Sequence, residues 1–285
     1  MKRHVVLPAR GVLIVNTDVH GNARDFVRVE AIFRAERSLE PETHWVILGD
    51  IVHAPDPTAR QSSPDFYDFD DGSMAIVDRI LALQAELPGH VHFVLGNHDH
   101  GHCGGPHTHK FYPDEVAALE STLSEAQRAG LRGLCENALL AVAAPCGVLM
   151  THGSPDTSLE SLADLDDMPL AVADMTPAQK QMMRALLTSY GQPDHVCIPM
   201  LANVSRAANV DLRVVVHGHD RDERGFFHEG SHQVCPVIFG AAHPNKRYLR
   251  LDLGAKYEIA AEVREDFEIL RLHEPVREDL ARVSQ

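Results

Sequence analysis

Long apolar runs are absent from this sequence of 285 residues. No window approaches the roughly 18 uninterrupted apolar residues of a membrane-spanning helix, so no membrane span is expected. The N-terminus begins with basic residues, but Pro8, Arg10 and Gly11 interrupt the apolar stretch that a signal peptide needs. We therefore expect a cytoplasmic protein that does not bind a membrane.

Paired cysteine motifs and an excess of positive charge are also missing. The five cysteines are odd in number and widely spaced, with no Cys-x-x-Cys pair, which is typical of free thiols in a reducing cytoplasm. The formal net charge of −15 argues against a nucleic-acid duplex as a partner. Histidine is abundant instead, and its 19 residues raise the expectation of bound metal ions.

The rest of the composition fits a globular chain with a proper core, because 44% of the residues are hydrophobic and 24% are charged. We find neither an internal repeat nor a low-complexity linker, and expect one domain over residues 1–285. Residues 54–73 break the alternation of strands and helices, so we expect a long loop there, either a solvated insertion or a lid. Residues 154–211 are expected to form a helical insertion or cap.

An apolar strand followed at once by Asp, His or Asn occurs five times. The most informative copy is residues 91–95, which end in Gly96, Asn97, His98 and Asp99. Ligands of open α/β sheets bind at the C-terminal ends of strands, so we expect these side chains to meet. The other copies end in Asp18 and His20, in Gly49 and Asp50, in His152 and Gly153, and in His217, Gly218 and His219.

Apolar periodicity predicts an α/β fold. Buried strands are expected at 11–15, 45–48, 91–95, 138–144, 148–150 and 212–216, and helices at 23–39, 73–87, 113–129 and from Thr176 onward. Asn22 and Thr176 are predicted helix caps. The runs 234–239, 248–253 and 257–263 are expected to be antiparallel strands of a second sheet, and 274–285 to be a surface helix.

The side chains at the five strand ends offer hard oxygen and imidazole nitrogen but no thiolate. That donor set suits divalent Mn, Fe, Zn or Co better than a structural zinc site. The run 100–109 is rich in histidine and glycine as well. It is compatible with metal binding, but we favour a flexible loop beside the site, because compositional motifs match by chance often.

The five blocks, written DxH, GD, GNHD, HG and GH in that order, resemble the calcineurin-like metallophosphoesterase superfamily. Asp18, His20 and Asn22, together with the segment from Phe239 to Asn245, resemble most its serine/threonine phosphoprotein phosphatase branch. The resemblance implies a four-layer α/β/β/α sandwich with two mixed sheets. It also implies a hydrolase with two metal ions, divalent or of mixed valence, with Mn and Fe favoured over Zn and Co.

The resemblance also implies roles for individual residues. Asp50 would bridge the two ions, with Asp18 and His20 completing one site and Asn97, His152 and His219 the other. A hydroxide between the ions would attack phosphorus. His98 would protonate the leaving oxygen, and Asp99 would fix its tautomer. Asn97 and His98 would also contact the substrate.

The C-terminal block allows two alignments with the family pattern. In one, His217 and His219 are a pair of ligands. In the other, which we favour, Gly218 precedes a single ligand, His219, and Arg221 stands where a second histidine would be. Arg221 would then contact the phosphate. It would compensate for the absence of the arginine that the branch has where this chain has Ala54.

The favoured activity is hydrolysis of a phosphate monoester, on a phosphoprotein or a small molecule. A phosphodiesterase or a dinucleoside-polyphosphate hydrolase is the alternative, since the same pair of metals serves both. A non-catalytic scaffold of the same fold is a remote alternative, because the ligand set is complete.

Overall fold

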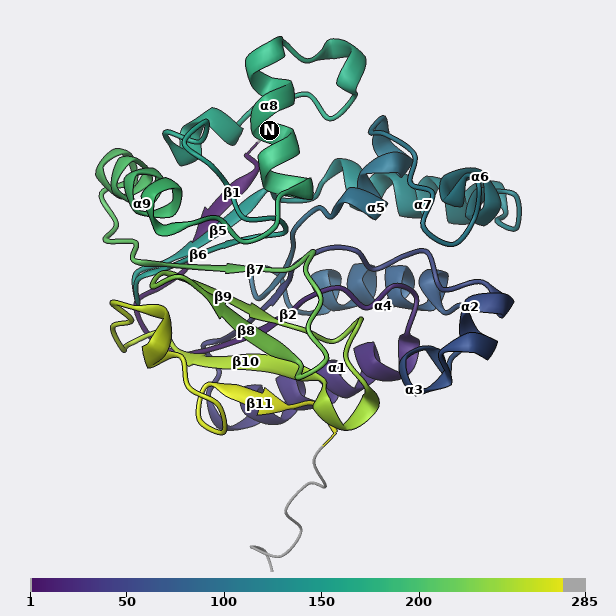
Figure 1. The fold of residues 1–285 in the computed structure, drawn as a ribbon, viewed down its shortest axis with the longest axis horizontal. Coiled ribbons are helices and arrows are strands. Elements are labelled where there is room, and N and C mark those ends of the chain that lie inside the picture. Colours follow the sequence, from purple (N-terminus) through teal and green to yellow (C-terminus); the bar gives the residue numbers. More distant parts are fainter. Residues whose placement is uncertain (1, 274–285) are drawn as a thin grey trace, which may run out of the picture.

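Two β-sheets packed face to face form the centre of the molecule, and helices cover their outer faces (Figure 1). A computed structural model describes residues 2–273. The six-stranded sheet has the order β1 (His4–Val6), β5 (Ala141–Ala144), β6 (Val148–Thr151), β7 (Val214–His217), β9 (Gln233–Pro236) and β8 (Phe226–Glu229). The five-stranded sheet has the order β11 (Ile269–Arg271), β10 (Arg247–Asp252), β2 (Val12–Asn16), β3 (Thr43–Ile47) and β4 (Val91–Phe93).

Both sheets are mixed, as expected. In the five-stranded sheet β2, β3 and β4 are parallel, β10 runs antiparallel to β2, and β11 runs antiparallel to β10. In the six-stranded sheet β6, β7 and β9 are parallel, flanked by antiparallel β5 and β8. The C-terminal ends of β2, β3, β4, β6 and β7 carry the five sequence blocks, and parallel neighbours bring such ends to a common edge.

Alternation along the strands produces four layers. Leu13 and Val15 of β2 face the core between the sheets, whereas Ile14 between them faces the helical layer. Helices α1 (Ala23–Leu39) and α4 (Ser73–Glu86) cover the five-stranded sheet, and α8 (Pro177–Thr188) and α9 (Asp194–Ala208) cover the other. This is the α/β/β/α sandwich that was expected.

The layer beneath α1 is anchored by Trp45 of β3. Its ring is fully buried against Phe26 and Phe33, with centroids 5.1 and 5.5 Å away. Its indole N–H donates to Oδ1 of Asn16 at 2.7 Å, so the polar end of the ring is satisfied. Both helix caps read from the sequence are present, at Asn22 for α1 and at Thr176 with Gln179 for α8.

Several predicted elements differ from the structure. Residues 54–73 are not a continuous loop but contain α2 (Pro57–Ser62) and α3 (Pro64–Tyr67). Each begins with a proline in its first turn after Asp56 or Ser63, a helix-start signal that the acidic composition obscured. The helix expected at 113–129 is two helices, α6 (Glu115–Glu120) and α7 (Glu125–Glu136), because Ser124 and Gln127 form a new capping box.

The C-terminal part of the sheets was predicted only in part. The run 248–253 corresponds to β10, but β10 pairs with β2 of the five-stranded sheet. Residues 257–263 are not a strand: Tyr257, Ala260 and Val263 are buried at a spacing of three, and η5 (Ala260–Glu262) is a 3₁₀ turn. Strands β8 and β11 were not predicted. The helix expected at 274–285 lies outside the described residues.

The histidine-rich run 100–109 is not a flexible loop at its start. Helix α5 (Asn97–His100) continues into η1 (Gly101–Cys103), and the side chains of His100 and His102 are buried. Residues 154–211 contain η2 (Leu162–Leu165) and η3 (Val172–Asp174) before α8 and α9; η4 (His243–Asn245) follows later.

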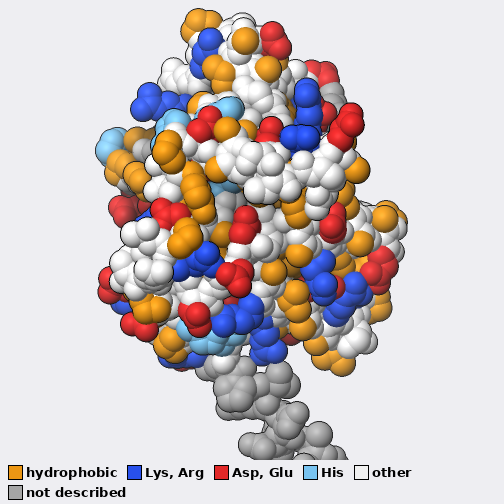
Figure 2. Space-filling view, turned by 90° about the vertical axis from the view of Figure 1, so that its right-hand side faces the viewer, with side chains coloured by type: hydrophobic (Ala, Val, Ile, Leu, Met, Phe, Trp, Pro, Cys, Tyr) orange, Lys and Arg blue, Asp and Glu red, His pale blue; other side chains and the backbone are white. Residues whose placement is uncertain are grey.

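Within 2–273, no helix combines the length and apolarity needed to cross a bilayer. All five cysteines are buried and free. On the face shown in Figure 2, acidic and basic side chains are interspersed, so the net charge of −15 is not gathered into one patch there.

Candidate active site

The loops after β3 and β4 touch at two glycines. A Cβ on Gly49 would lie 2.5 Å from the backbone nitrogen of Gly96, and a Cβ on Gly96 would lie 2.2 Å from that of Asp50. No side chain fits at either position. The two glycines therefore let the carboxylate of Asp50 and the side chains of α5 approach one another.

Four residues around this contact adopt a left-handed backbone. The φ angles are 43° at His20, 50° at Asp50, 69° at His53 and 67° at His219. Such a conformation costs a side-chain-bearing residue on the order of 1–2 kcal/mol. Strain of this kind concentrates at functional sites, and here it occurs in the loops after three strands, β2, β3 and β7, which meet at the cluster.

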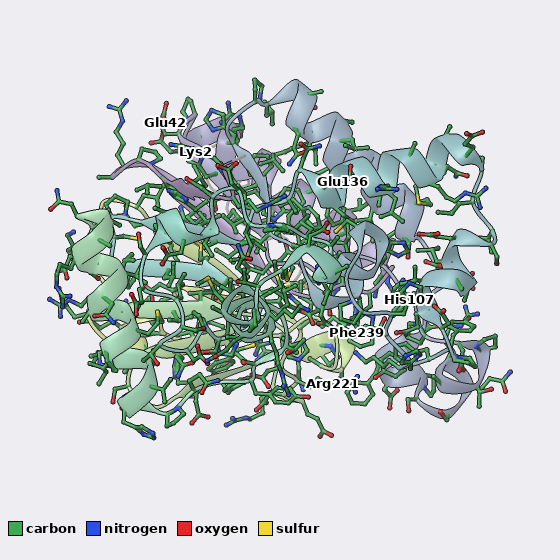
Figure 3. All side chains as sticks on the ribbon, turned by 90° about the horizontal axis from the view of Figure 1, so that it is seen from above. Lys2, Glu42, His107, Glu136, Arg221 and Phe239 are labelled. Carbon is green, nitrogen blue, oxygen red and sulfur yellow. The ribbon has the colours of Figure 1, made fainter. Side chains whose placement is uncertain are left out.

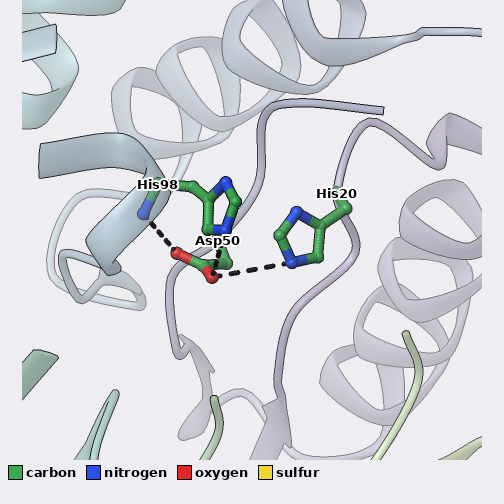
Figure 4. A group of neighbouring side chains, drawn as sticks. All are labelled: His20, Asp50 and His98. Atoms are coloured by element: carbon green, nitrogen blue, oxygen red, sulfur yellow. Dashed lines mark hydrogen bonds and ion pairs between the residues drawn. The ribbon is translucent and has the colours of Figure 1, made fainter. Parts of the chain in front are cut away.

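Asp50 lies at the centre of the cluster (Figure 4). Its Oδ2 is 3.6 Å from Nε2 of His20 and 4.0 Å from Nε2 of His98, while its Oδ1 is 3.5 Å from Nε2 of His152. Burial would raise the pKa of Asp50, but the neighbouring His152 and His98 outweigh burial and hold the pKa at about 2. The two oxygens of this carboxylate thus face different sets of histidines.

Backbone carbonyls fix how two of these histidines face Asp50. Nδ1 of His20 donates to the carbonyl of Val52 at 3.2 Å, and Nδ1 of His152 donates to that of Leu48 at 2.6 Å. A carbonyl only accepts, so the hydrogen resides on Nδ1 in both rings. Each Nε2 is then directed toward Asp50, where the neutral ring offers a lone pair as metal-binding histidines do. At His152 burial opposes a charge on the ring, but the carboxylates of Asp50 and Asp18 raise its pKa.

A second group of donors adjoins Asp50. Asn97 Oδ1 lies 3.0 Å from Nε2 of His152 and 2.9 Å from Nδ1 of His219. With its oxygen facing them, Asn97 offers a third lone pair to the same point; with its nitrogen facing them, it donates to both rings instead. Burial lowers the pKa of His219 to about 3, which keeps the ring neutral. These donors fit one divalent cation.

Asp18 completes the cluster on the side of His20. Its Oδ2 is 3.9 Å from Nε2 of His20, and its Oδ1 accepts from the backbone N–H of His219 at 3.1 Å. Burial, and then the charge of Asp50, raise the pKa of Asp18, although His152 opposes this. Two buried carboxylates this close are stabilised by positive charge, which two divalent ions would supply.

The expected partnership of His98 and Asp99 is wrong. The Asp99 carboxylate accepts from the backbone N–H groups of Asp50 at 2.7 Å, Ile51 at 3.0 Å and Gly96 at 3.0 Å. It therefore holds the two glycine loops together and does not orient the ring of His98. Consecutive residues of a helix point about 100° apart, and both lie in α5, which explains the difference.

His98 has other neighbours, which the sequence did not indicate. Its Nδ1 is surrounded by His53, Thr108 and Glu115. His53 follows Asp50 by three residues, but Glu115 begins α6, far from any of the five blocks. His98, His53 and Glu115 are all buried.

Two cations lie beside the cluster, and one of them was not expected. Nζ of Lys110 is 3.3 Å from Nε2 of His20 and 4.5 Å from the ring centre of Phe239. The guanidinium of Arg221 is 5.5 Å from the same ring, and its stem crosses Gly240, where a Cβ would collide with it. Lys110 is an exposed residue, but burial of its charged group beside the cluster, and then the charge of Arg221, lower its pKa to about 8. Figure 3 shows Arg221 and Phe239 on one side of the molecule with His107.

The structure separates the two histidines of the last block. His219 lies with Asn97 and His152, whereas Nδ1 of His217 donates to the carbonyl of Gly218 at 3.0 Å and its ring packs against Phe227. His217 ends β7, and the chain turns away from strand geometry at His219, so the two rings diverge. The pairing of His217 and His219 as ligands is not what this geometry supports.

Comparisons with known proteins agree with this fold. A family model described as calcineurin-like phosphoesterase matches residues 12–221. A protein serine/threonine phosphatase from Saccharomyces cerevisiae, with similarity to human phosphatase PP5, has a TM-score of 0.59 and 15% identity, covering 94% of this chain and 81% of its own. A mutant of a cold-active protein tyrosine phosphatase has a TM-score of 0.53 and 14% identity, covering 91% and 82%. Among curated proteins no match was found.

Proposed function

The chain belongs to the calcineurin-like phosphoesterase family, and on that premise we propose that it hydrolyses phosphate monoesters with two metal ions, as serine/threonine phosphatases do. The observation that carries this proposal is the position of Asp50. One oxygen faces His20 and the other faces His152, as a bridging ligand requires.

The described residues divide into two ligand sets around that bridge. Asp18, His20 and Asp50 would hold one ion; Asp50, Asn97, His152 and His219 would hold the other. Oxygen and imidazole donors without thiolate favour Mn or Fe, with Zn and Co as alternatives. When bound, such ions polarise the phosphoryl oxygens and lower the pKa of a water that attacks phosphorus.

His98 supplies the proton for the leaving oxygen. Its Nε2 is directed toward Asp50 while its Nδ1 is held inside the protein, so the ring spans from the interior to the reacting centre. General-acid assistance of this kind contributes about 10²–10⁴-fold in rate.

Lys110 and Arg221 favour a substrate with two negative charges. A monoester carries nearly one more charge than a diester, and cationic donors beside the reacting group stabilise it. Both cations contact the ring of Phe239, which itself packs against His20 with centroids 4.2 Å apart. They therefore lie beside the proposed centre.

The segment 54–73 is compatible with this substrate. Tyr67 of α3 stacks on Phe239 at 5.1 Å, so the segment contributes an aromatic side chain beside the site. Two of its carboxylates are engaged locally: Asp70 pairs with Arg60, and Asp71 accepts from Ser73. The repulsion that an acidic lid would exert on a dianion is thereby reduced. A phosphodiesterase or dinucleoside-polyphosphate hydrolase remains the competing activity.

The test is a comparison of two substrates with Mn supplied. The kcat/KM for an aryl phosphate monoester should exceed that for the matching bis-aryl diester. Arg221→Ala and Lys110→Met should each lower the monoester value by about 10–100-fold, as expected for a lost charge-assisted hydrogen bond, and change the diester value less. Arg206→Ala, at an exposed position of α9, is the control and should change neither. A wild-type preference for the diester would replace this proposal with a phosphodiesterase.

A further inference from the structure

Three polar side chains from three segments converge on one nitrogen of His98. Its Nδ1 lies 3.1 Å from Nδ1 of His53, 3.2 Å from Oγ1 of Thr108 and 3.3 Å from Oε2 of Glu115. The opposite nitrogen, Nε2, faces Asp50. One end of the ring is therefore held by the protein interior and the other is free to act at the centre.

A chain of hydrogen bonds fixes which atom donates. The carboxylate of Glu120 only accepts, so Nδ1 of His102, 2.8 Å away, carries its hydrogen. Burial lowers the pKa of His102 and keeps the ring neutral, so its Nε2 accepts from Nε2 of His53 at 3.0 Å.

Burial, and then the charge of His98, lower the pKa of His53 to about 3, so that ring is neutral as well. With its hydrogen on Nε2, His53 has an accepting Nδ1. The hydrogen in its contact with His98 therefore belongs to Nδ1 of His98.

Glu115 supplies a charged acceptor for the same hydrogen. The side chain is 1% exposed, and its Oε1 accepts from the backbone N–H of Phe111 at 3.1 Å. Oε2 is a buried atom without a hydrogen bond of ordinary geometry, and it approaches Nδ1 of His98 to 3.3 Å. Burial would raise the pKa of Glu115, but the hydrogen bond and charge of His98 outweigh burial and hold it at about 2. A buried carboxylate of this kind needs a donor.

We propose that Glu115 is the positioning residue for His98, accepting the Nδ1 hydrogen together with His53 so that the Nε2 hydrogen points at the leaving oxygen. This inference rests on the proposed function. In the reaction the bond from phosphorus to the leaving oxygen breaks and the Nε2 hydrogen moves to that oxygen. A proton released from the attacking water restores His98. Glu115 takes the role that the sequence suggested for Asp99.

The test is a double-mutant cycle with two leaving groups. Glu115→Gln, His98→Ala and the double variant are assayed on phenyl phosphate, a poor leaving group, and on p-nitrophenyl phosphate, a better one. Glu115→Gln should lower kcat on phenyl phosphate by about 10–100-fold, within the range of general-acid effects, with KM and bound metal unchanged. The loss on p-nitrophenyl phosphate should be smaller.

The cycle separates positioning from a structural role. In the His98→Ala background, Glu115→Gln should cost less than about 2-fold, because residues that act as a unit are not additive. Glu125→Gln, the same change at an exposed position of α7, should be silent. His53→Gln replaces the other acceptor of the His98 Nδ1 hydrogen and should show the same leaving-group dependence. It is the variant to measure if Glu115→Gln does not fold.

Three results would overturn the assignment. The first is an equal loss of kcat on both substrates in Glu115→Gln. The second is an undiminished effect of Glu115→Gln in the His98→Ala background, and the third is a loss of bound metal in Glu115→Gln. The last result would identify Glu115 as a ligand. A wild-type protein that hydrolyses neither monoester would refute the proposed function itself. If the wild type is active and His98→Ala alone shows the leaving-group dependence while Glu115→Gln does not, only the positioning role of Glu115 fails.

Discussion

Acid should destabilise the metal-free protein through two buried histidines far from the candidate active site. His44 of β3 and His92 of β4 are 5% and 8% exposed, and Nδ1 of the first lies 3.3 Å from Nε2 of the second. Burial, and then the charge of His90, lower the pKa of His44 to about 4. Burial, and then the charge of His44, lower the pKa of His92 to about 4.

The direction and size of the effect follow from these values. Between about pH 6.5, the ordinary pKa of histidine, and pH 4, the unfolded chain binds protons that the folded chain does not. The free energy of unfolding therefore falls as the pH is lowered through this window and is constant above it. For one ring with a pKa of about 4, the loss between about pH 7.5 and pH 4.5 is about 2.5 kcal/mol. The losses of the two rings are not independent, because the charge of His44 is one cause of the shift at His92.

Urea denaturation with a chelator present, at about pH 7.5 and pH 4.5, measures the effect. His92→Gln cannot titrate, so its loss of stability over this interval should be about 2.5 kcal/mol smaller than that of the wild type. His195→Gln, at an exposed position of α9, is the matched control and should lose as much as the wild type. Equal pH dependence in wild type and His92→Gln would refute the reasoning.

Three further predictions concern the candidate site. Asp50→Asn should weaken both metal sites and Asn97→Ala mainly one, measured as metal per chain after dialysis; two tightly held ions in Asp50→Asn would exclude the bridge. His98→Ala should keep its metal but lose about 10²–10⁴-fold in rate on esters with poor leaving groups and less on activated aryl esters, and an equal loss on both would count against a general acid. His219→Ala should abolish metal-dependent turnover while His217→Ala stays folded with a milder loss, and equal metal loss in both would restore the two-histidine arrangement.

The parts of the site that could be predicted are those that follow strands directly. A side chain at the end of a parallel strand has its position set by the sheet, so Asp18, Asp50, Asn97 and His152 could be assigned to one location from local pattern alone. The same local signals predicted the caps of α1 and α8 and the positions of most strands along the chain.

The parts that could not be predicted depend on contacts between distant segments. Glu115 meets His98 only because the chain returns to α5 at the start of α6, and Lys110 reaches His20 from just after the histidine-rich run. Neither residue belongs to a local pattern. Asp99 was misassigned because adjacency in sequence was taken for adjacency in space, whereas α5 turns its side chain toward the loop amides.

The central claim is a two-metal centre bridged by Asp50, and the most direct measurement counts its ions while it works. Metal-free protein is titrated with Mn, and both the Mn bound per chain and the hydrolysis of an aryl phosphate monoester are followed. We predict two Mn per chain, with activity appearing as the second ion binds. Full activity with a single ion, or two bound ions without hydrolysis, would contradict this account.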